Sequence, residues 1–562
     1  MLQSSQRPLS ASAVYILSSQ TKYLASATRP LTSSRTRKLF HSENAEWVPG
    51  NRFSSKLDFN AHQIFAAKSS SELLRALAIQ SVCKIKPLVR NANALISASR
   101  AIAPSALVGF ALKHTFFSHF CGGTSLSEIQ KTIHRLESSG VGSILDYAAE
   151  ADVGHLVEGS ALNESLELNC ANSISAVHAC SHQATGYTAL KVTSMTPPEV
   201  LMKASTLLKS SHDAFLRLCT ERAITPGTIP LVREDDFVSS FERDEEQQAR
   251  RLFSTLCERA GRGADDRSPL TYGEWMSVFS PLEVLPEGAS GVLGIGEKSL
   301  DLTDSDREQL AAGVERLHRV ASVADGLGNV RVLVDAEQSY MQSAIDWMAN
   351  GAAARFNRGG RAVVMNTYQC YLKDASTRLV LDLQRAEAEG WLMGAKLVRG
   401  AYMEQERRLA AEGGTEDPIH PTKEATHACF DACAAELIRR LPFGAEVLLG
   451  THNEDSILKA VGLMKDLGLP LDTPGFAVAQ LLGMCDHVTF GLAAHGCRAF
   501  KYVPYGPVLD VLPYLLRRAE ENSDLLGTGG KEMRLMGRAL MSKVGVKFPS
   551  QSQQQQEQQG VL

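Results

Sequence analysis

The chain has 562 residues, a formal net charge of −4 and 44% hydrophobic residues. That length allows one large domain with appendages or two to three ordinary domains, and the nearly balanced charge gives no electrostatic case for binding nucleic acid. The eleven cysteines include no CxxC pair, and this cysteine usage suits a reducing compartment.

Cysteine and histidine come close together in two places, at residues 178–182 and 427–433. Such clusters can ligate a metal, but neither has the paired spacing that is typical of a zinc site. We therefore expect no metal.

The first forty residues differ in composition from the rest of the chain. No Asp or Glu precedes Glu43, whereas Arg and Lys are scattered among Ser, Thr and Ala. This composition is typical of an organellar transit peptide, and a disordered basic tail is the alternative. We expect residues 1–60 to be a transit peptide and leader, directed to the mitochondrion rather than to a plastid.

Apolar segments give no sign of a membrane span. No run reaches the ~18 uncharged apolar residues that a spanning helix needs. The longest candidate, residues 101–112, contains Pro104 and could be a buried helix or lie at a membrane surface. We expect it to be buried.

The next part of the chain, residues 61–140, is expected to form a helical arm, because apolar residues recur at helical spacing. Strand-like apolar runs and helical segments then alternate. Short buried strands separated by amphipathic helices indicate parallel pairing through right-handed crossovers. Eight such units over residues 141–530 predict an α/β protein with a (β/α)8 barrel. The expected strands are residues 143–147, 188–193, 330–335, 362–367, 393–398, 446–451, 476–478 and 499–503.

The excess length over a minimal barrel falls between the second and third strands. This insertion, about residues 196–300, is rich in charge and lacks strand alternation, so we expect extra helices packed on the barrel. Ser305 and Glu308 have the spacing of a capping box for a helix that ends near Gly326. The C-terminal tail, residues 531–562, is Gln-rich and is expected to be disordered at its end.

Active sites of such barrels lie at the carboxyl ends of the strands. Each polar residue there has a structural explanation of its own: Lys191 and Asp335 could be a buried ion pair, and His452 a core histidine. Cations from several units that meet on one rim instead predict an anion-binding pocket. The residues at these ends are Glu150, Lys191, Asp335, Glu337, Gln369, Lys396, Arg399, Gly400, Ala401, Tyr402, Thr451, His452, Asn453, Gln480, Leu481 and Tyr502.

A helix after the last strand carries Tyr514, Arg517, Arg518 and Glu521 on one face. Two guanidiniums beside aromatic rings make a clamp for a small carboxylate. The alternative is an exposed face with an Arg517–Glu521 pair, which is common and weak. The chain has no nucleophile elbow, Walker loop, HExxH motif or GxGxxG after its first strand, so a cofactor is expected to supply the reactivity.

These motifs resemble those of the mitochondrial proline dehydrogenase (proline oxidase) family over about residues 116–526, outside the insertion. The family is an FAD-containing distorted (β/α)8 barrel, and the resemblance implies the same fold and cofactor here. The matching segments are Ala189–Lys191, Val334–Glu337, Tyr368–Tyr371, Lys396–Tyr402, Thr451–Asn453, Gln480–Met484 and the block from Tyr502 to Arg518.

The resemblance also implies roles for individual residues. The proline carboxylate would be gripped by Lys191, Arg517 and Arg518, and the ring would be enclosed by Leu481, Tyr502 and Tyr514. The catalytic pair would be Asp335, which orients Lys191, and Lys396, where bacterial members have arginine. Glu150 would act as a gate that pairs with the first arginine. FAD would be held by Ala336, Gln369, Arg399, Gly400, Ala401, Thr451, His452, Asn453 and Glu521.

The implied reaction is FAD-dependent oxidation of L-proline to 1-pyrroline-5-carboxylate, with a hydride passing from C5 to the flavin N5. Electrons would then pass to ubiquinone, with peripheral association on the matrix side of the inner mitochondrial membrane. A related group that oxidises hydroxyproline tends to have a smaller residue at the position of Tyr502, so the phenol there implies a preference for proline.

Three alternatives stay open. A folate-reductase type of flavin barrel would need a pterin-sized pocket, and an aldolase-type barrel would use a Schiff-base lysine with glycine-rich loops at the last two strands. The third is a non-enzymatic mitochondrial binding protein built on the same barrel.

Overall fold

The computed structural model describes residues 57, 59, 62–65, 68–147, 160–219, 229–263, 266–294, 302–526 and 530–546. The leader, the Gln-rich end of the tail and the expected gate residue Glu150 lie outside the described residues.

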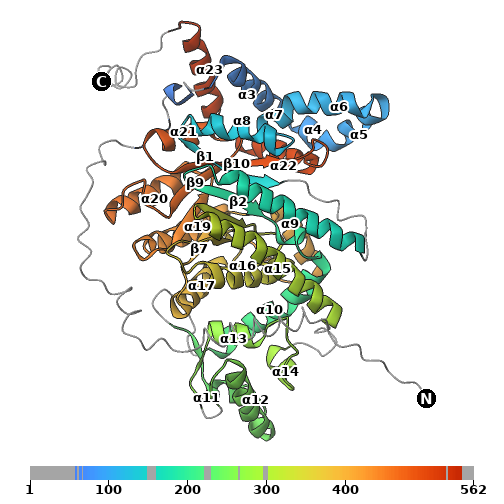
Figure 1. Ribbon diagram of the computed structural model, residues 1–562, viewed down its shortest axis with the longest axis vertical. Coiled ribbons are helices and arrows are strands. Elements are labelled where there is room, and N and C mark those ends of the chain that lie inside the picture. The colour runs from blue at the N-terminus through green and yellow to red at the C-terminus, as the bar shows by residue number, and fades with distance from the viewer. Residues whose placement is uncertain are drawn as a thin grey trace.

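Eight parallel strands close into a barrel at the centre of the molecule, which confirms the fold that the sequence predicts (Figure 1). Around the barrel the strands follow the order β1-β10-β9-β8-β7-β6-β5-β2. Chain order is thus kept around the ring, as expected when each strand is joined to its neighbour by a helical crossover. The strands are β1 (Val141–Tyr147), β2 (Gly186–Leu190), β5 (Val330–Val334), β6 (Val364–Gln369), β7 (Gly394–Val398), β8 (Glu446–Gly450), β9 (Phe476–Leu481) and β10 (Ala499–Tyr505).

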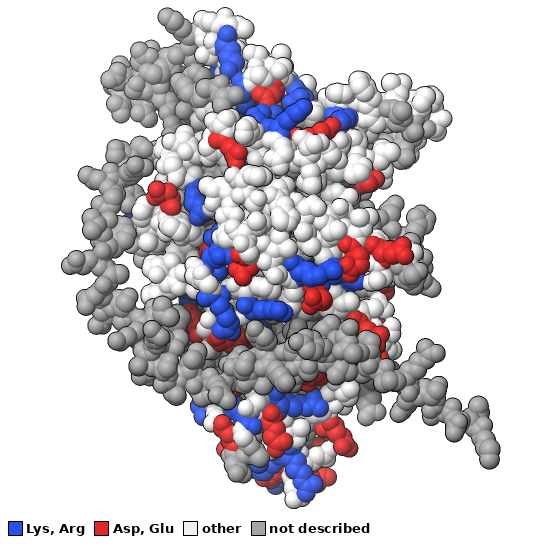
Figure 2. All heavy atoms as spheres, in the orientation of Figure 1, with Lys and Arg blue, Asp and Glu red and all other residues white. Residues whose placement is uncertain are grey.

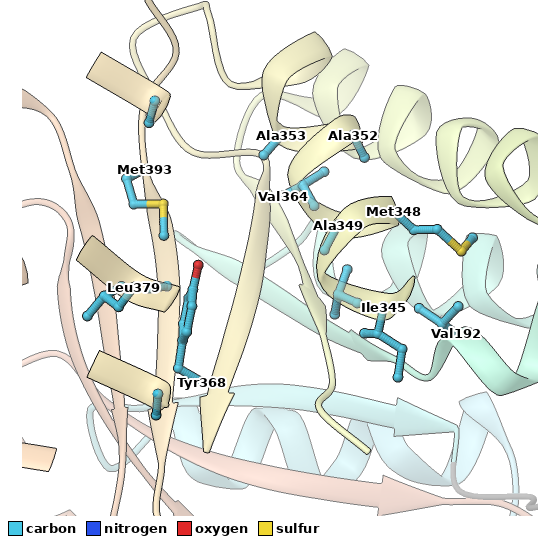
Figure 3. Close-up of a cluster of buried hydrophobic side chains, with 14 of the residues drawn as sticks. Val192, Ile345, Met348, Ala349, Ala352, Ala353, Val364, Tyr368, Leu379 and Met393 are labelled. Carbon is cyan, nitrogen blue, oxygen red and sulfur yellow. The ribbon is translucent and has the colours of Figure 1, made fainter. Parts of the chain in front are cut away.

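Side chains of each strand alternate between the barrel interior and the surrounding helices. On β6, Met365 packs in the interior cluster, whereas Val364 and Tyr368 pack in the cluster beneath the helices. Figure 3 shows the outer layer, where Val364 and Ala349 lie close together and the ring of Tyr368 stands near Leu379 and Met393. The Tyr368 hydroxyl donates to Asp382 Oδ2 at 2.7 Å, so this buried polar atom has its partner.

Helices form the outer layer of the barrel. Among them α10 packs against α16, and α15 packs against α9, α16 and β5. The barrel helices are α9 (Ser160–Cys180), α10 (Pro198–Leu218), α15 (Asp304–Leu327), α16 (Ser339–Phe356), α17 (Ala375–Glu389), α18 (Met403–Gly413), α19 (Lys423–Ile438), α20 (Glu454–Asp466), α21 (Asp486–Ala494) and α22 (Leu512–Leu526).

The helix α15 begins two residues earlier than the capping box predicted from Ser305 and Glu308. Thr303 is the N-cap, and its hydroxyl accepts from the backbone N–H of Asp306 at 3.1 Å. In turn, the Asp306 carboxylate accepts a hydrogen bond from the Thr303 N–H at 2.8 Å. The predicted box was wrong because an equally good Thr-x-x-Asp pair precedes it, and Ser305 lies inside the helix.

The insertion between β2 and β5 is mainly helical, and α11 and α12 extend to the far end of the molecule (Figure 1). Its residues also form a two-stranded antiparallel pair, β3 (Leu231–Val232) with β4 (Leu270–Thr271), which the sequence analysis did not anticipate. Figure 2 shows positive and negative side chains interspersed around this end. The insertion helices are α11 (Glu234–Val238), α12 (Glu246–Arg259), α13 (Tyr272–Val278) and α14 (Ala289–Leu293).

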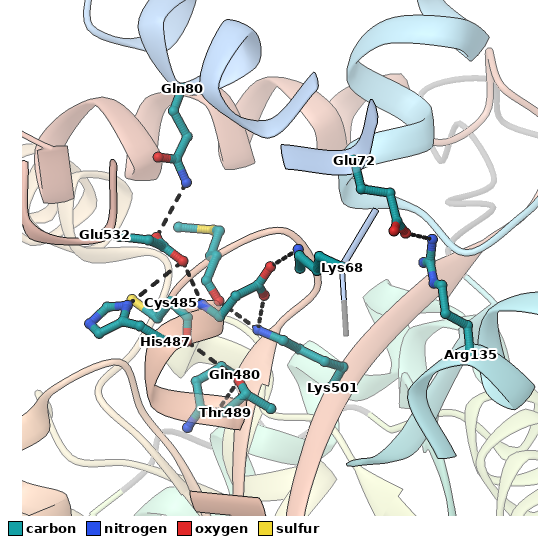
Figure 4. Close-up of polar contacts among 12 residues, drawn as sticks. Lys68, Glu72, Gln80, Arg135, Gln480, Cys485, His487, Thr489, Lys501 and Glu532 are labelled. Atoms are coloured by element: carbon teal, nitrogen blue, oxygen red, sulfur yellow. Dashed lines mark hydrogen bonds and ion pairs between the residues drawn. The ribbon is translucent and has the colours of Figure 1, made fainter. Parts of the chain in front are cut away.

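The helical arm packs across one end of the barrel, where α3 and α4 contact α22. Polar side chains anchor it: the Asp486 carboxylate pairs with both Lys68 and Lys501, and Gln80 Nε2 donates to Glu532 at 3.2 Å (Figure 4). These bonds join the arm to β10 and to the last described helix. The arm and that helix comprise η1 (His62–Phe65), α3 (Ser70–Cys83), α4 (Lys86–Arg90), α5 (Ala92–Ile102), α6 (Ser105–Leu112), η2 (Lys113–Phe117), α7 (Ser118–Phe120), α8 (Leu126–Glu137) and α23 (Lys531–Lys543).

The expected burial of residues 101–112 is wrong. Pro104 separates α5 from α6, and the side chains of Ile102, Leu107 and Phe110 are 88%, 59% and 62% exposed. These two helices point away from the barrel (Figure 1), and no described element outside the arm covers this apolar surface. Among the described residues, no helix has the length and apolar character needed to cross a membrane.

Candidate active site

The alternation of the strands decides which side chains face the barrel mouth. Ala189 and Leu333 pack in the barrel interior, and two positions farther along the chain come Lys191 and Asp335. The backbone stays extended at Lys191, and the Asp335 N–H donates to the Leu190 carbonyl at 2.9 Å, so the strand geometry continues to these residues. The same two-residue step from interior positions gives Asp146, Leu481 and Tyr502, and two such steps from Met365 give Gln369.

Asp335, Lys396 and Tyr502 form one connected group at this mouth. Lys396 pairs with Asp335 Oδ1, and the Tyr502 hydroxyl donates to Asp335 Oδ2 at 2.8 Å. The Lys396 ammonium lies 5.7 Å from the centre of the Tyr502 ring, within cation–π range. Burial, with the charges of Asp146 and Asp335, holds the pKa of Tyr502 well above its usual range, so the phenol remains protonated and donates.

Lys191 and Arg517 approach the same side chain from different elements. Burial and the Glu337 carboxylate raise the pKa of Tyr402 to about 12, while the charges of Lys191 and Arg517 act in the opposite direction. Glu337 is itself buried, and its carboxylate accepts from the Thr193 hydroxyl at 2.7 Å. Lys191 and Arg517 are therefore both within electrostatic reach of the Tyr402 phenol.

Arg518 extends from α22 into a buried position, with its guanidinium 5.0 Å from the centre of the Tyr514 ring. It forms an ion pair with Glu521, three residues farther along α22. The Arg518 Nε and the Tyr514 hydroxyl are shielded from solvent and have no hydrogen-bond partner. Buried polar atoms of this kind are costly unless a ligand satisfies them.

Arg399 follows β7 and lies between α19 and α20. Its guanidinium donates to His427 Nδ1 at 2.8 Å, to Thr451 Oγ1 at 2.6 Å and to Ser456 Oγ at 2.9 Å, and it stacks on Phe430 at 4.5 Å. Burial lowers its pKa. No Asp or Glu in the part of the chain that the structure describes forms an ion pair with it. Its hydrogen bonds to His427, Thr451 and Ser456 are thus to groups without negative charge.

His452 is a neutral imidazole. Burial, with the nearby Lys501 and Arg518 cations, lowers its pKa to about 3. Its Nε2 accepts from the Leu481 N–H at 3.2 Å, so the proton of the neutral ring is on Nδ1. Its neighbour Asn453 caps α20, because Asn453 Oδ1 accepts from the Ser456 N–H at 3.0 Å. Thr451 and His452 therefore present fixed polar groups beside Arg399.

The remaining expected cofactor residues lie on the same rim. Gln369 is buried, and its Nε2 donates to the Glu337 carbonyl at 2.7 Å, which fixes the side-chain amide. Gly400 has φ +131°, and a Cβ there would approach the Tyr371 ring to 2.4 Å, so only glycine fits this turn. Ala401 follows it and is exposed, and Ala336 follows Asp335 in a half-buried position.

The sequence analysis missed one contributor to this mouth. Asp146 is buried near the end of β1, and its charge adds to the effect of burial in raising the pKa of both Tyr502 and Tyr514. Tyr402, which the sequence placed at the strand ends, lies near Lys191 and Arg517. Asp146 could have been found from alternation, since it lies two residues after the interior residue Ile144.

A closed parallel barrel with buried cations, phenols and carboxylates at the carboxyl ends of its strands has the architecture of a (β/α)8-barrel enzyme. A family model described as "Proline dehydrogenase" matches residues 129–528 of the chain. The chain belongs to the proline dehydrogenase family and is an oxidoreductase.

Similar proteins agree with this assignment. Proline dehydrogenase 1, mitochondrial, of Caenorhabditis elegans is 31% identical over 86% of this chain and 88% of its own length. Hydroxyproline dehydrogenase of Xenopus laevis is 30% identical over 87% of this chain and 90% of its own length. The solved structure of proline utilization A from Bdellovibrio bacteriovorus has 14% identity and a TM-score of 0.48; the likeness covers 90% of this chain and 42% of that chain, and it adds nothing to the assignment.

Proposed function

We propose that this protein oxidises L-proline to 1-pyrroline-5-carboxylate, with FAD as its cofactor. The observation that carries the proposal is the pair of buried, unsatisfied groups on α22, Arg518 Nε and the Tyr514 hydroxyl, beside the Asp335–Lys396–Tyr502 group. A small zwitterion with a compact ring matches this combination of cation, phenol and apolar wall.

The cations bind and orient the substrate. Arg518, Arg517 and Lys191 bind its carboxylate, and a guanidinium can do so through two parallel N–H bonds. Leu481 and Tyr502 lie side by side in the register of β9 and β10 and bound the ring. A pocket that fixes both ends of the substrate holds C5 at a reacting distance of roughly 3–3.5 Å.

The same cations favour the reactive protonation state. Positive charge near the substrate ammonium disfavours its protonated form and lowers its pKa. Oxidation removes a hydride from C5 and a proton from the ring nitrogen, and the product is the cyclic imine. A neutral amine is a better hydride donor than an ammonium. The cations that bind the carboxylate therefore also favour the reactive, neutral form of the substrate nitrogen.

The residues on the far side of the rim fit FAD. Arg399, without a carboxylate partner in the described chain, suits a diphosphate, and the Nδ1 proton of His452 suits an acceptor on a flavin ring. The other residues that would hold FAD, at or just after the strand ends, are Ala336, Gln369, Gly400, Ala401, Thr451 and Asn453. Glu521 would reach the adenine end. When bound, FAD supplies a two-electron acceptor for the hydride, which no side chain of the chain can provide.

Electrons would leave to ubiquinone at the matrix side of the inner mitochondrial membrane, with the protein bound peripherally. Support comes from the arm: no Asp or Glu lies between Glu72 and Glu128, whereas six Lys or Arg do. Exposed apolar side chains of α5 and α6 accompany this positive charge, and the outer end of the arm is almost free of charged atoms in Figure 2. Cationic helices with an exposed apolar face bind the surface of anionic bilayers.

Anaerobic titration of the purified full chain with L-proline tests the proposal. We expect a yellow protein whose flavin absorbance bleaches with proline and returns with a soluble quinone. A protein that carries flavin but bleaches only with trans-4-hydroxyproline would assign the activity of the Xenopus relative instead. A colourless protein that cannot be reconstituted with FAD would refute the proposal.

A further inference from the structure

Three cysteines meet outside the active site, at a place that no part of the proposed reaction uses. Cys370 comes directly after β6, and Cys429 and Cys433 lie on α19. Their sulfur atoms all lie within 4.8 Å of one another, and none of the three residues is more than 8% exposed. The spacing of four residues places Cys429 and Cys433 on one face of the helix, opposite the end of the strand.

A fourth donor comes from the loop that precedes α19. The His420 N–H donates to the Tyr371 carbonyl at 2.8 Å, and the Lys373 N–H donates to the Pro418 carbonyl at 2.9 Å. An isolated antiparallel β-bridge between Leu372 and Ile419 lies between these two hydrogen bonds in the sequence and joins the same two segments. The backbone of His420 is thereby fixed next to the segment that carries Cys370.

The His420 side chain lies close enough to the sulfur cluster to act electrostatically on Cys429. Its Nε2 is shielded from solvent and has no hydrogen-bond partner among the described residues. Zinc binds the thiolate form of cysteine, so the closeness of the three sulfur atoms is the observation that points to a metal.

We propose that Cys370, Cys429, Cys433 and His420 form a structural zinc site. Three thiolates and one imidazole are a closed tetrahedral set for Zn²⁺. With Zn–S bonds of about 2.3 Å, tetrahedral sulfurs lie about 3.8 Å apart, so the sulfur atoms need to approach by about 1 Å at most. Zinc forms three bonds to sulfur and one to nitrogen, and each thiol that was protonated releases its proton to solvent.

Sequence spacing alone led to the expectation of no metal, because Cys370 is 59 residues before Cys429 in the chain. The fold supplies the missing pairing by placing the end of β6 against α19. A disulfide is the competing chemistry, but it would use only two of the three sulfurs and would leave His420 unexplained.

The metal would stabilise the cofactor side of the barrel. It would join the end of β6, next to Gln369, to the helix whose Phe430 stacks on Arg399 and whose His427 accepts from Arg399. This consequence depends on the proposed function, whereas the zinc site itself does not.

The test is zinc content of the purified full chain, produced in zinc-supplemented medium and dialysed without chelator. We expect about one zinc per chain. Cys370→Ser and Cys433→Ser should each lower that content at least about tenfold. Cys257→Ser, at a buried cysteine of α12 in the insertion, should leave it unchanged. Wild-type protein with less than about a tenth of a zinc per chain would overturn the proposal, as would a Cys370 disulfide found by mass spectrometry of unreduced peptides.

A second measurement covers cysteine variants that fail to fold. Chelator-treated wild-type protein is titrated with Co²⁺ alone, and we expect thiolate-to-cobalt charge-transfer bands together with the intense d–d bands of tetrahedral cobalt. His420→Asn, at a half-buried loop position, should keep the charge-transfer bands but lower the affinity for cobalt at least about tenfold. Absence of charge-transfer bands in the wild type contradicts the site. A protein that contains zinc but whose flavin is not bleached by proline would refute only the proposed function. A protein whose flavin is bleached by proline but that contains no zinc would refute only the metal site.

Discussion

Tyr502 donates its phenolic hydrogen to Asp335 Oδ2 at 2.8 Å, across the barrel mouth from the last strand to the loop after β5. Lys396 holds the other carboxylate oxygen. The phenol therefore has a fixed orientation, and its ring is a rigid wall rather than a mobile side chain.

This fixed ring predicts substrate selectivity. Because Tyr502 cannot move aside without breaking its bond to Asp335, it should exclude a ring hydroxyl, and kcat/KM should favour L-proline over trans-4-hydroxyproline by about 10². Tyr502→Ser should reduce this ratio at least about tenfold. Tyr505→Phe, on the same strand but packed against Tyr147, is the control and should leave the ratio unchanged. Equal turnover of both substrates by the wild type would contradict the prediction.

The buried guanidinium of Arg518 predicts a separation of KM from cofactor binding. Arg518→Met removes a charge-assisted contact to the substrate carboxylate, and we expect KM for proline to rise about 10–100-fold. Flavin content, measured by the absorbance ratio of the purified protein, should stay within about twofold of wild type. Arg534→Met, at an exposed cation of α23, is the matched control. An unchanged KM would show that Arg518 does not contact the substrate.

For Arg399 we expect the opposite result, a loss of cofactor binding with little change in KM for proline. Since its charge has no carboxylate partner in the described chain, Arg399→Met should remove an anion contact of FAD and lower flavin retention at least about tenfold after gel filtration. Added FAD should restore part of the activity, with KM for proline near the wild-type value. Arg408→Met, at a mostly exposed position of α18, should retain flavin normally. Full flavin retention by Arg399→Met would remove this residue from the cofactor site.

The exposed arm predicts binding to anionic membranes. Phe110→Glu places a charge at a 62% exposed apolar position of α6, and it should lower co-sedimentation with cardiolipin-containing vesicles at least about fivefold. Leu168→Glu changes an equally exposed leucine on α9, outside the arm, and should bind as the wild type does. Both proteins should retain proline-dependent flavin bleaching. Equal vesicle binding by the two variants would exclude α6 as the membrane-binding element.

The sequence predicted the barrel well because its strands are short apolar runs with a clear boundary at each end. Once the strands are known, alternation places Lys191, Asp335, Gln369 and Tyr502 at the mouth without further information. The same reasoning could not place Arg399 between two helices, because its contacts to His427 and Ser456 depend on how α19 and α20 pack.

Long-range pairings were the other limit. The partners of Asp335 are 61 and 167 residues away, and nothing in the local pattern distinguishes Lys396 from Lys191 as its salt-bridge partner. The exposure of Phe110 was missed for a related reason. The sequence pattern of an apolar helix is the same whether or not another part of the protein covers it. The sulfur cluster likewise appears only when β6 and α19 are placed together.

His487 predicts how stability depends on pH. Burial alone would lower its pKa, but a hydrogen bond to Glu454 and the Glu532 carboxylate, 3.7 Å from Nδ1, raise it to about 9. Figure 4 shows the contact with Glu532. A pKa raised above the unfolded value of about 6.5 means that the protonated ring stabilises the fold fully below pH 6.5, and that this contribution is lost as the pH rises toward 9.

The Tm of the full chain should therefore fall between pH 6.5 and pH 9, as measured by scanning calorimetry or fluorescence. His487→Gln keeps a hydrogen-bond donor without a titrating charge, so its Tm should be lower than that of the wild type at pH 6.5 and should approach it near pH 9. His134→Gln, at an exposed histidine of α8, controls for surface charge and should keep the wild-type slope. If His487→Gln and the wild type lose the same number of degrees over this interval, then the imidazolium contact with Glu454 and Glu532 does not stabilise the junction between α20, α21 and α23.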